Sequence, residues 1–253
     1  MSNRSIHTLL KNWDEECPLT REEAVEVLNL PEEEMDSLME CAYALRTKYK
    51  GKKVSVQLLT NVRSGNCTQN CAYCAQSKDS QAEIEKYKRV SDEKLYGDND
   101  LVDEKHLARH CIGLSGIGFS DEEIEDLADR IREMKKKDTQ ICCSIGFLTE
   151  KQARILKDAG LDRINHNLNS SRSFYPEICT THTYDQRVNN IKMLQSLGFE
   201  ICSGGIVGMG ESKEDIVDML MDLREINPES VPINFLLPIP GTRLADRDIS
   251  ELT

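Results

Sequence analysis

Three cysteines lie close together in the stretch from Gly65 to Cys74. Cys67 and Cys71 are separated by three residues, and Cys71 and Cys74 by two. In a chain without secretory features, such crowding favours a metal site over disulfide bonds. Iron–sulfur clusters normally bind four cysteine thiolates, so three would leave one iron free for a non-protein ligand. A zinc site is the alternative, but no further cysteine or histidine follows until His106, a poor fit to compact zinc spacing.

The cysteine spacing, with Tyr73 before the last cysteine, resembles the signature of the radical S-adenosyl-L-methionine (AdoMet) enzymes. The resemblance implies that Cys67, Cys71 and Cys74 hold a [4Fe-4S] cluster. It also implies that the open iron binds the amino acid end of AdoMet and passes it an electron.

A longer resemblance covers residues 54–244, which are similar to the biotin synthase family. It rests on matched stretches at residues 65–77, 109–111, 165–169, 174–184, 202–211 and 229–234. The resemblance implies a sulfurtransferase that converts dethiobiotin to biotin by radical sulfur insertion, with a [2Fe-2S] cluster as the sulfur donor. Because a saturated C–H bond has no acidity for a base to exploit, no side chain is assigned as a catalytic acid or base.

A second set of cysteines, Cys111, Cys142 and Cys202, lies on three different predicted strands. Inward residues of neighbouring barrel strands stack in layers, so these thiols could converge. Composition alone leaves buried structural cysteines as the alternative, and the resemblance assigns the three to the [2Fe-2S] cluster. Cys143 is the rival for Cys142, because consecutive strand residues face opposite sides.

Asparagines recur at every second position near the middle of the fourth predicted strand. Asn165, Asn167 and Asn169 are therefore expected to share one face, opposite His166. The resemblance assigns Asn165 and Asn234 to the ureido ring of dethiobiotin, and Asn167 and Asn169 to the AdoMet ribose. An inter-strand amide ladder is the structural alternative.

The resemblance implies further contacts with AdoMet. Arg187 matches the residue that pairs with the AdoMet carboxylate, which suits the fork geometry of a guanidinium, and a surface arginine is the alternative. Tyr73 and Ile206 are expected to flank the adenine. Relatives commonly carry aspartate at the position of Asn169, so ribose binding is expected to be weaker here without being lost.

Alternating strands and helices must position these residues. Strands are predicted at residues 53–61, 110–114, 140–146, 163–169, 200–208 and 231–237. Helices are predicted at 120–136, 149–159, 183–197 and 212–226, and from residue 91 with a break at 97–100. This rhythm predicts an α/β fold, a TIM-type barrel with six βα units that stays incomplete because eight strands close such a barrel. The barrel is assigned to residues 51–253.

Residues 1–50 are predicted to form an N-terminal helical cap. The expected helices run from Ser5 to Trp13, from the capping signal at residues 20–23 to Leu28, and from Pro31 to Lys50. The last helix carries an apolar stripe that predicts a partner surface, formed by Met35, Leu38, Met39, Ala42 and Leu45.

A formal net charge of −12 over 253 residues argues against a nucleic-acid-binding protein. No apolar run is long enough to span a bilayer, so a cytoplasmic protein is expected, with its ten cysteines reduced. Cys17, Cys41 and Cys179 are interpreted as small buried hydrophobic residues. The expected partners are dethiobiotin, a flavodoxin- or ferredoxin-type electron donor and a second copy in a homodimer.

The resemblance to the family ends shortly after residues 241–244. Family members continue and supply an arginine ligand to the [2Fe-2S] cluster from a later strand, and neither Arg243 nor Arg247 is its equivalent. The chain is therefore expected to be truncated at the C-terminus, either as a fragment of a longer enzyme or as a shortened form that holds the second cluster weakly. For the shortened form, AdoMet cleavage is favoured over biotin formation. The alternatives are another biotin-synthase-like radical enzyme, such as a maturase or mutase, and a non-catalytic iron–sulfur protein.

Overall fold

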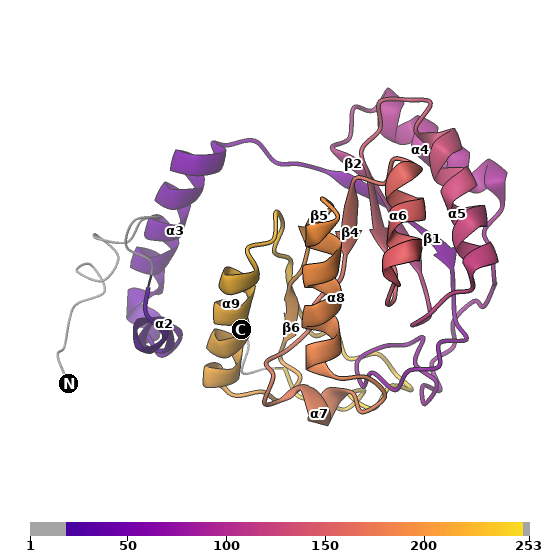
Figure 1. Cartoon of the computed structure of the whole chain (residues 1–253). Coiled ribbons are helices and arrows are strands. Elements are labelled where there is room, and N and C mark those ends of the chain that lie inside the picture. Colours follow the sequence, from indigo (N-terminus) through magenta and orange to yellow (C-terminus); the bar gives the residue numbers. More distant parts are fainter. Residues whose placement is uncertain (1–18, 250–253) are drawn as a thin grey trace.

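The structure, a computed structural model, describes residues 19–249. Parallel strands form a curved sheet whose outer side is covered by helices (Figure 1). The expected helix from Ser5 to Trp13 lies outside the described residues, as does Cys17.

Five strands pair in the order in which they occur in the chain. They are β1 (Gln57–Arg63), β2 (Arg109–Leu114), β3 (Ile141–Ser144), β4 (Arg163–Asn165) and β5 (Glu200–Cys202). A second parallel pair consists of β6 (Gly205–Val207) and β7 (Ile233–Phe235). Isolated bridges from Cys202 to Ser230 and from Asn169 to Gly205 connect this pair to the five-stranded sheet. The sequential order is what repeated βα units produce.

The helices that follow the strands are α4 (Asp92–Glu104), α5 (Asp121–Met134), α6 (Glu150–Asp158), α7 (Tyr175–Ile178), α8 (Tyr184–Ser196) and α9 (Lys213–Ile226). Capping boxes fix the starts of four of them, at Ser120, Thr149, Thr183 and Ser212. In each box a side-chain oxygen satisfies a backbone N–H that the helix leaves unpaired. The short helix α7 was not predicted.

One row of strand residues forms the centre of the core. Ile112, Cys143, Ile164 and Ile201 are register partners across β2 to β5, and all four are fully buried. They face the helices, and burying each isoleucine contributes roughly 1.5–3 kcal/mol. Because side chains alternate along a strand, the residues before and after them face the interior of the arc.

The predicted α/β fold and the incomplete barrel are confirmed. Within residues 19–249, β1 pairs only with β2 and β7 only with β6, so the arc has two open edges. Apolar side chains stay exposed on both edge strands, including Leu59 at 63% and Phe235 at 67%.

Most of the predicted strands are shorter than expected, and two of these differences shape the site. The chain leaves β4 after Asn165, and Asn169 adopts a left-handed conformation with a φ of 72°. The strand predicted at 200–208 is divided into β5 and β6 at Gly204, where an added Cβ would lie 1.8 Å from the carbonyl oxygen of Pro232. Only a glycine leaves room for the backbone of Pro232 at this interruption between the two strands.

The predicted helix break at residues 97–100 is wrong, because α4 continues through it. Leu95 and Val102 bury the inner face of the helix on either side of these residues. Asn99 is itself buried and donates to the carbonyl oxygen of Met134 at 3.2 Å. Tertiary packing therefore outweighs the low helix propensity of Gly97 and its neighbours.

Three N-terminal elements lie to one side of the sheet: α2 (Arg21–Leu28), the 3-10 helix η1 (Glu32–Glu34) and α3 (Met35–Lys50) (Figure 1). Thr20 and Glu23 form the predicted capping box of α2. Arg21 pairs with Asp218 of α9 at 2.6 Å. The apolar stripe of α3 has no buried member, and Met39 is 63% exposed, so no partner surface covers it within the described residues.

Between residues 19 and 249, no helix combines the length and the apolar character that a bilayer-spanning segment needs.

Candidate active site

The cysteine loop follows β1 directly and lies at the end of the arc where parallel barrels carry their chemistry. Gly65 and Asn66 both adopt left-handed conformations, with φ of 72° and 53°, which turns the chain sharply away from the strand. The thiols of Cys67, Cys71 and Cys74 are free and half-buried. The turn thus presents three thiols, none of them in a disulfide bond, beside the interior of the arc.

A cavity of about 280 Å³ opens next to these thiols. Its lining includes each residue that the sequence assigned to the first cluster, to AdoMet or to the substrate: Cys67, Cys71, Tyr73, Cys74, Asn165, Asn167, Asn169, Arg187, Ile206 and Asn234. Gln69, His166 and His182 also line it and were not predicted. The structure therefore brings together side chains that are scattered over most of the sequence.

His166 was expected to lie on the face opposite the asparagines, and its side chain is 2% exposed with both ring nitrogens buried. It lines the same cavity because β4 ends at Asn165, so the alternation of a strand does not extend further. Its ring packs against Phe147, with 5.2 Å between the ring centroids. Burial lowers the pKa of His166 to about 3, so the ring is neutral at physiological pH.

Arg187 is the centre of a hydrogen-bond network on one wall of the cavity. Its Nε donates to the hydroxyl of Tyr175, Nη1 donates to the carbonyl oxygen of Asn167 at 3.1 Å, and Nη2 donates to Nε2 of His182 at 2.9 Å. The Nδ1 of His182 donates to Oε1 of Gln69 at 2.9 Å. A guanidinium has five N–H groups, so two of those on Arg187 remain for an anionic ligand.

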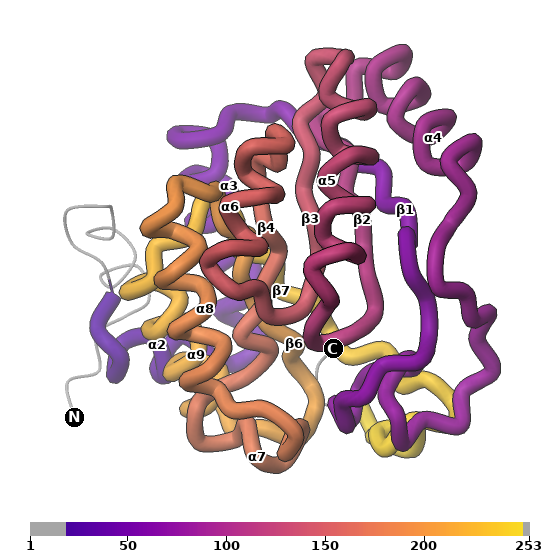
Figure 2. The backbone as a smooth tube through the Cα atoms, turned by 45° about the vertical axis from the view of Figure 1, so that its right-hand side comes forward, coloured from indigo at the N-terminus to yellow at the C-terminus, as the bar shows by residue number. Residues whose placement is uncertain are grey.

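The cysteine loop is held by the segment that follows α7. The Asn70 side chain donates to Oγ1 of Thr180 at 2.7 Å and accepts from its backbone N–H at 3.0 Å. Ala72 N–H donates to the carbonyl oxygen of Ile178 at 2.8 Å. Arg243, from the C-terminal segment that passes beside the loop (Figure 2), donates to the carbonyl oxygens of Asn70 and Ile178, both at 3.0 Å. Two distant parts of the chain thus fix the loop.

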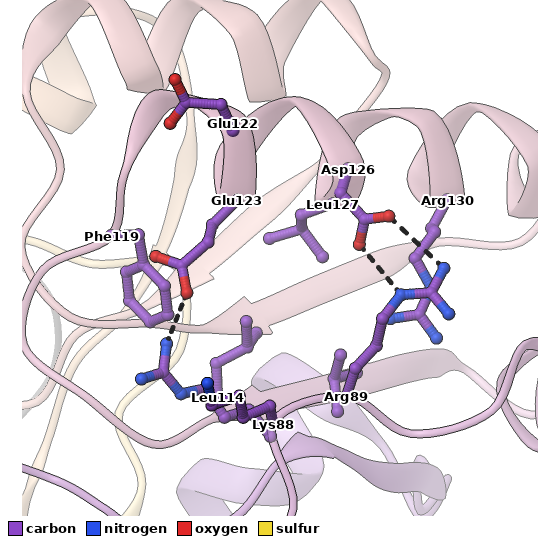
Figure 3. A pocket seen from close by; sticks show the side chains of 11 residues that line it. Lys88, Arg89, Leu114, Phe119, Glu122, Glu123, Asp126, Leu127 and Arg130 are labelled. Carbon is purple, nitrogen blue, oxygen red and sulfur yellow. Dashed lines mark hydrogen bonds and ion pairs between the residues drawn. The ribbon is translucent and has the colours of Figure 1, made fainter.

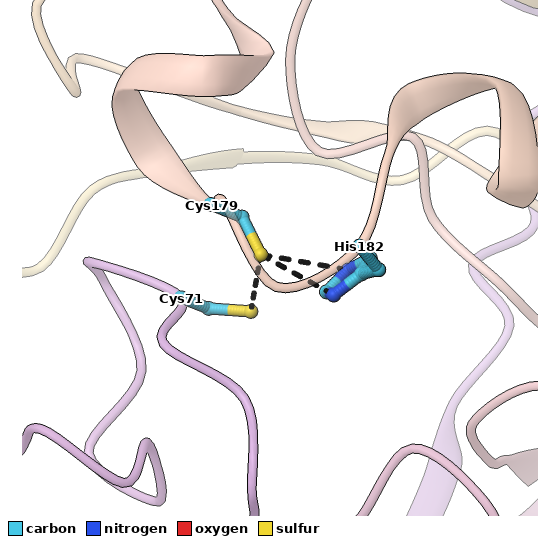
Figure 4. A group of neighbouring side chains, drawn as sticks. All are labelled: Cys71, Cys179 and His182. Atoms are coloured by element: carbon cyan, nitrogen blue, oxygen red, sulfur yellow. Dashed lines mark hydrogen bonds between the residues drawn. The ribbon is translucent and has the colours of Figure 1, made fainter.

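Cys179 is buried as predicted, but it is not an isolated hydrophobic residue. Its Sγ lies 3.8 Å from that of Cys71 and 3.3 Å from Nδ1 of His182 (Figure 4). The hydrogen bond from Cys71 lowers the pKa of Cys179, while the pKa of Cys71 is raised, so the pair retains one proton. Two residues separate Cys179 from His182, and this metal-ligand spacing is the signal that could have revealed the contact between these two residues.

The second set of cysteines lies deeper in the arc, on the strands themselves. Cys111 and Cys142 are register partners on β2 and β3, and a hydrogen bond between them lowers the pKa of Cys111 to about 7. Cys202 lies on β5 opposite Asn165, whose Nδ2 donates to its Sγ at 3.2 Å. Cys143 is fully buried in the core on the other face of β3.

Two arginines add positive charge near this second set. Arg109 and Arg163 share the carboxylate of Glu200, with N–O distances of 3.1 and 2.7 Å, and both lower the pKa of Cys111. Nη1 of Arg109 is buried and has no hydrogen-bond partner among the described residues. The region therefore favours negatively charged groups.

A second pocket, of about 310 Å³, lies outside the arc between α5 and the segment that precedes α4 (Figure 3). Four of its charged groups form two ion pairs: Arg63 with Glu123 at 3.0 Å and Arg89 with Asp126 at 3.2 Å. The cysteines of both sets are absent from its lining.

Comparison with known proteins agrees with this geometry. Residues 61–223 match the radical SAM superfamily. A biotin synthase of Geobacillus kaustophilus is 42% identical over 228 residues, which cover 90% of this chain and 68% of that protein. The chain belongs to the biotin synthase family of radical SAM enzymes. The biotin synthase of Bacillus subtilis is 40% identical over 89% of this chain and 68% of its own length.

Solved structures show the same fold at lower sequence identity. Methylornithine synthase (PylB) superposes with a TM-score of 0.84 at 18% identity, over 97% of this chain and 72% of that one. The FeFe-hydrogenase maturase HydG of Carboxydothermus hydrogenoformans gives 0.78 at 20% identity, over 94% and 58%. Membership of the radical SAM superfamily implies a [4Fe-4S] cluster and AdoMet.

Proposed function

We propose that this radical SAM enzyme is a cytoplasmic sulfurtransferase that converts dethiobiotin to biotin. The observation that carries the proposal is one cavity lined by three free thiols, a partly free guanidinium and a row of amides, with three more cysteines on the strands below. Identity of 42% to a biotin synthase supports the choice of reaction. A homodimer and a flavodoxin- or ferredoxin-type electron donor complete the proposal.

Cys67, Cys71 and Cys74 are proposed to hold the [4Fe-4S] cluster. They fit it because all three thiols are free, half-buried and carried on one short loop. When bound, the two clusters and AdoMet supply the one-electron chemistry and the sulfide that insertion into saturated carbon requires. The two remaining N–H groups of Arg187 would bind the AdoMet carboxylate, and Tyr175 and His182 hold the guanidinium in that orientation.

Cys111, Cys142 and Cys202 are proposed to hold the [2Fe-2S] cluster. The positive charges of Arg109 and Arg163 would offset the negative charge of a thiolate-bound cluster, and the unpaired Nη1 of Arg109 offers it a hydrogen bond. These two features support a cluster over three structural thiols, since structural thiols need no cationic neighbours.

The asparagine side chains are proposed to select and orient the substrate. A ureido ring presents both N–H donors and a carbonyl acceptor, and the amides of Asn165 and Asn234 can complement both. Asn167 and Asn169 are proposed to bind the AdoMet ribose, with Tyr73 and Ile206 beside the adenine. Because Asn165 also contacts Cys202, bound substrate would lie next to the second set of cysteines.

The test is anaerobic reconstitution with iron and sulfide, followed by addition of AdoMet, dethiobiotin and a reductant. We expect about six irons per chain, from one cubane and one rhombic cluster, and formation of both 5′-deoxyadenosine and biotin. Reconstituted Cys71→Ala protein is the control and should form neither product. One zinc and no iron in wild-type protein, or 5′-deoxyadenosine without biotin at full iron content, would overturn the proposal.

A further inference from the structure

Cys71, Cys179 and His182 form a cluster of metal-ligand atoms that the proposed function does not use as a unit. Their nearest ligand atoms all lie within 4.8 Å of one another. Cys71 comes from the loop after β1, Cys179 from the end of α7 and His182 from the turn before α8, and the three side chains point toward a common centre (Figure 4). The fold therefore assembles these groups from segments more than one hundred residues apart.

The distances from the Cys179 sulfur to the other two groups are close to those around a tetrahedral zinc ion. Zinc–sulfur bonds of about 2.3 Å at the tetrahedral angle place two sulfurs about 3.8 Å apart, and a sulfur and a nitrogen about 3.5 Å apart. The Cys71 and Cys179 sulfurs are 3.8 Å apart. Nε2 of His182 lies 3.8 Å from the Cys179 sulfur, slightly more than the ideal value.

His182 is already oriented as a metal-binding histidine. Ligating histidines usually donate the N–H of the other ring nitrogen to a carbonyl or carboxylate, and Nδ1 of His182 donates to Oε1 of Gln69 at 2.9 Å. Nε2 is then the nitrogen with a free lone pair, and it now accepts a hydrogen bond from Arg187 at 2.9 Å. A metal ion at Nε2 would replace that hydrogen bond.

We propose that the chain without its iron–sulfur clusters binds one zinc ion through Cys71, Cys179 and His182. Two thiolates neutralise the charge of the ion, and three protein ligands leave a fourth position for water. Water can reach that position because Cys71 and His182 line the cavity. Zinc and the [4Fe-4S] cluster then compete for Cys71; this competition rests on the proposed function, whereas zinc binding does not.

The first experiment titrates zinc into the full-length, reduced, iron-free chain in the presence of a chromophoric chelator. Wild-type protein should bind one zinc ion, and Cys179→Ser should weaken binding at least about tenfold. Cys67→Ser should leave the affinity unchanged, as should the matched control Cys41→Ser on α3. If Cys67→Ser abolishes binding while Cys179→Ser retains it, zinc occupies the loop cysteines instead and the proposal is wrong.

Cobalt substitution tests the ligand set in the wild-type chain and so does not depend on any variant folding. Tetrahedral cobalt bound by two thiolates gives a charge-transfer band about two thirds as intense as that of a three-thiolate site. We expect the two-thiolate intensity, and a shift of the visible bands in His182→Asn. The three-thiolate intensity would contradict the proposed set.

The competition is measured by reconstituting zinc-loaded and zinc-free protein side by side. Zinc-loaded wild-type protein should take up about two irons, and zinc-free protein about six. Iron uptake by Cys179→Ser should not respond to zinc. Full iron uptake with the zinc retained would overturn the shared use of Cys71, whereas failure of zinc-free protein to take up iron would overturn the proposed function and leave the zinc titration valid.

Discussion

Cys142 and Cys143 are neighbours in the chain, yet they face opposite sides of β3. Cys142 contacts Cys111 on the inner face, and Cys143 is fully buried in the core among isoleucines. The alternation of side chains along a strand is the physical reason that only one of them can take part in an interior site.

Cys142→Ser should therefore lower the iron content of reconstituted protein from about six to about four per chain, because it removes a ligand of the two-iron cluster alone. The matched variant Cys143→Ser should keep about six. Iron analysis with paramagnetic resonance of the reduced protein separates the two clusters. If Cys143→Ser loses two irons and Cys142→Ser does not, Cys143 is the cluster ligand and Cys142 is not.

Spacing in the sequence indicates which residues share a loop, but it does not show which distant residues the fold places against them. The short spacing of Cys67, Cys71 and Cys74 revealed a shared loop, and they do line one cavity. Cys179 contacts Cys71 from 108 residues away, and no local pattern reports such a contact. Its meaning is visible only after the segment between α7 and α8 has been placed against the loop.

Asn169 lies in the cavity with a left-handed backbone, a conformation that aspartate also tolerates. A hydrogen bond to a carboxylate is stronger than one to a neutral amide by about 1 kcal/mol, so Asn169→Asp should tighten AdoMet binding by about fivefold. Equilibrium binding to reconstituted protein measures this. Asn227→Asp, at the exposed left-handed end of α9, is the control and should bind AdoMet as wild type does. Weaker binding by Asn169→Asp would argue against its contact with the ribose.

Gly97 lies in the interior of α4, the helix that the sequence was expected to break. An added Cβ there would meet no heavy atom within 4 Å. Gly97→Ala should therefore raise the free energy of unfolding by about 0.5–1 kcal/mol, since alanine loses less backbone entropy in a helix. Denaturant titration checks this, and a lower stability would mean that the helix is not formed as described.

Gly204→Ala is the opposing control at the turn between β5 and β6. Its Cβ would lie 1.8 Å from the backbone oxygen of Pro232, so the variant should lose at least about 1–3 kcal/mol. The two glycines differ in surroundings that only the fold supplies. Alternating apolar residues predicted where the strands lie. The ends of the strands depend on contacts between distant residues, which the pattern does not report. The end of β4 and the division into β5 and β6 were therefore not predicted.

At the scale of the whole molecule, stability should fall in mild acid. His110 is fully buried between Thr60 and Asn99, and burial lowers its pKa from 6.5 to about 4. The unfolded chain takes up a proton near pH 6.5 and the folded chain only near pH 4. This contribution to stability is therefore complete above pH 6.5 and is lost as the pH falls toward 4.

Between pH 7 and pH 5, His110 should account for a loss of roughly 2 kcal/mol in the free energy of unfolding. The free energy of unfolding of His110→Asn should fall less over this interval than that of wild type, by roughly 2 kcal/mol. This difference is expected whatever the stability of the variant at pH 7. His106→Asn, at an exposed left-handed position, should follow the wild-type curve. If wild type and His110→Asn show the same pH dependence, protonation of His110 does not destabilise the folded chain and the prediction is wrong.

The open arc could be predicted because it depends on the number of βα units in the sequence and not on individual side-chain contacts. Six strand patterns fall short of the eight that close a barrel, and the described strands indeed leave both edges unpaired. The apolar stripe of α3 shows the converse. The spacing of apolar residues in the sequence shows that one face of α3 is apolar. It does not show whether another part of the molecule covers that face, and Met39 on it is exposed.

The cysteine loop is joined to the chain after α7 by Asn70 and to the C-terminal segment by Arg243. During synthesis, the ribosome therefore releases the loop thiols long before the residues that hold them exist. Iron and sulfide therefore meet a fully held loop only after synthesis has passed Arg243.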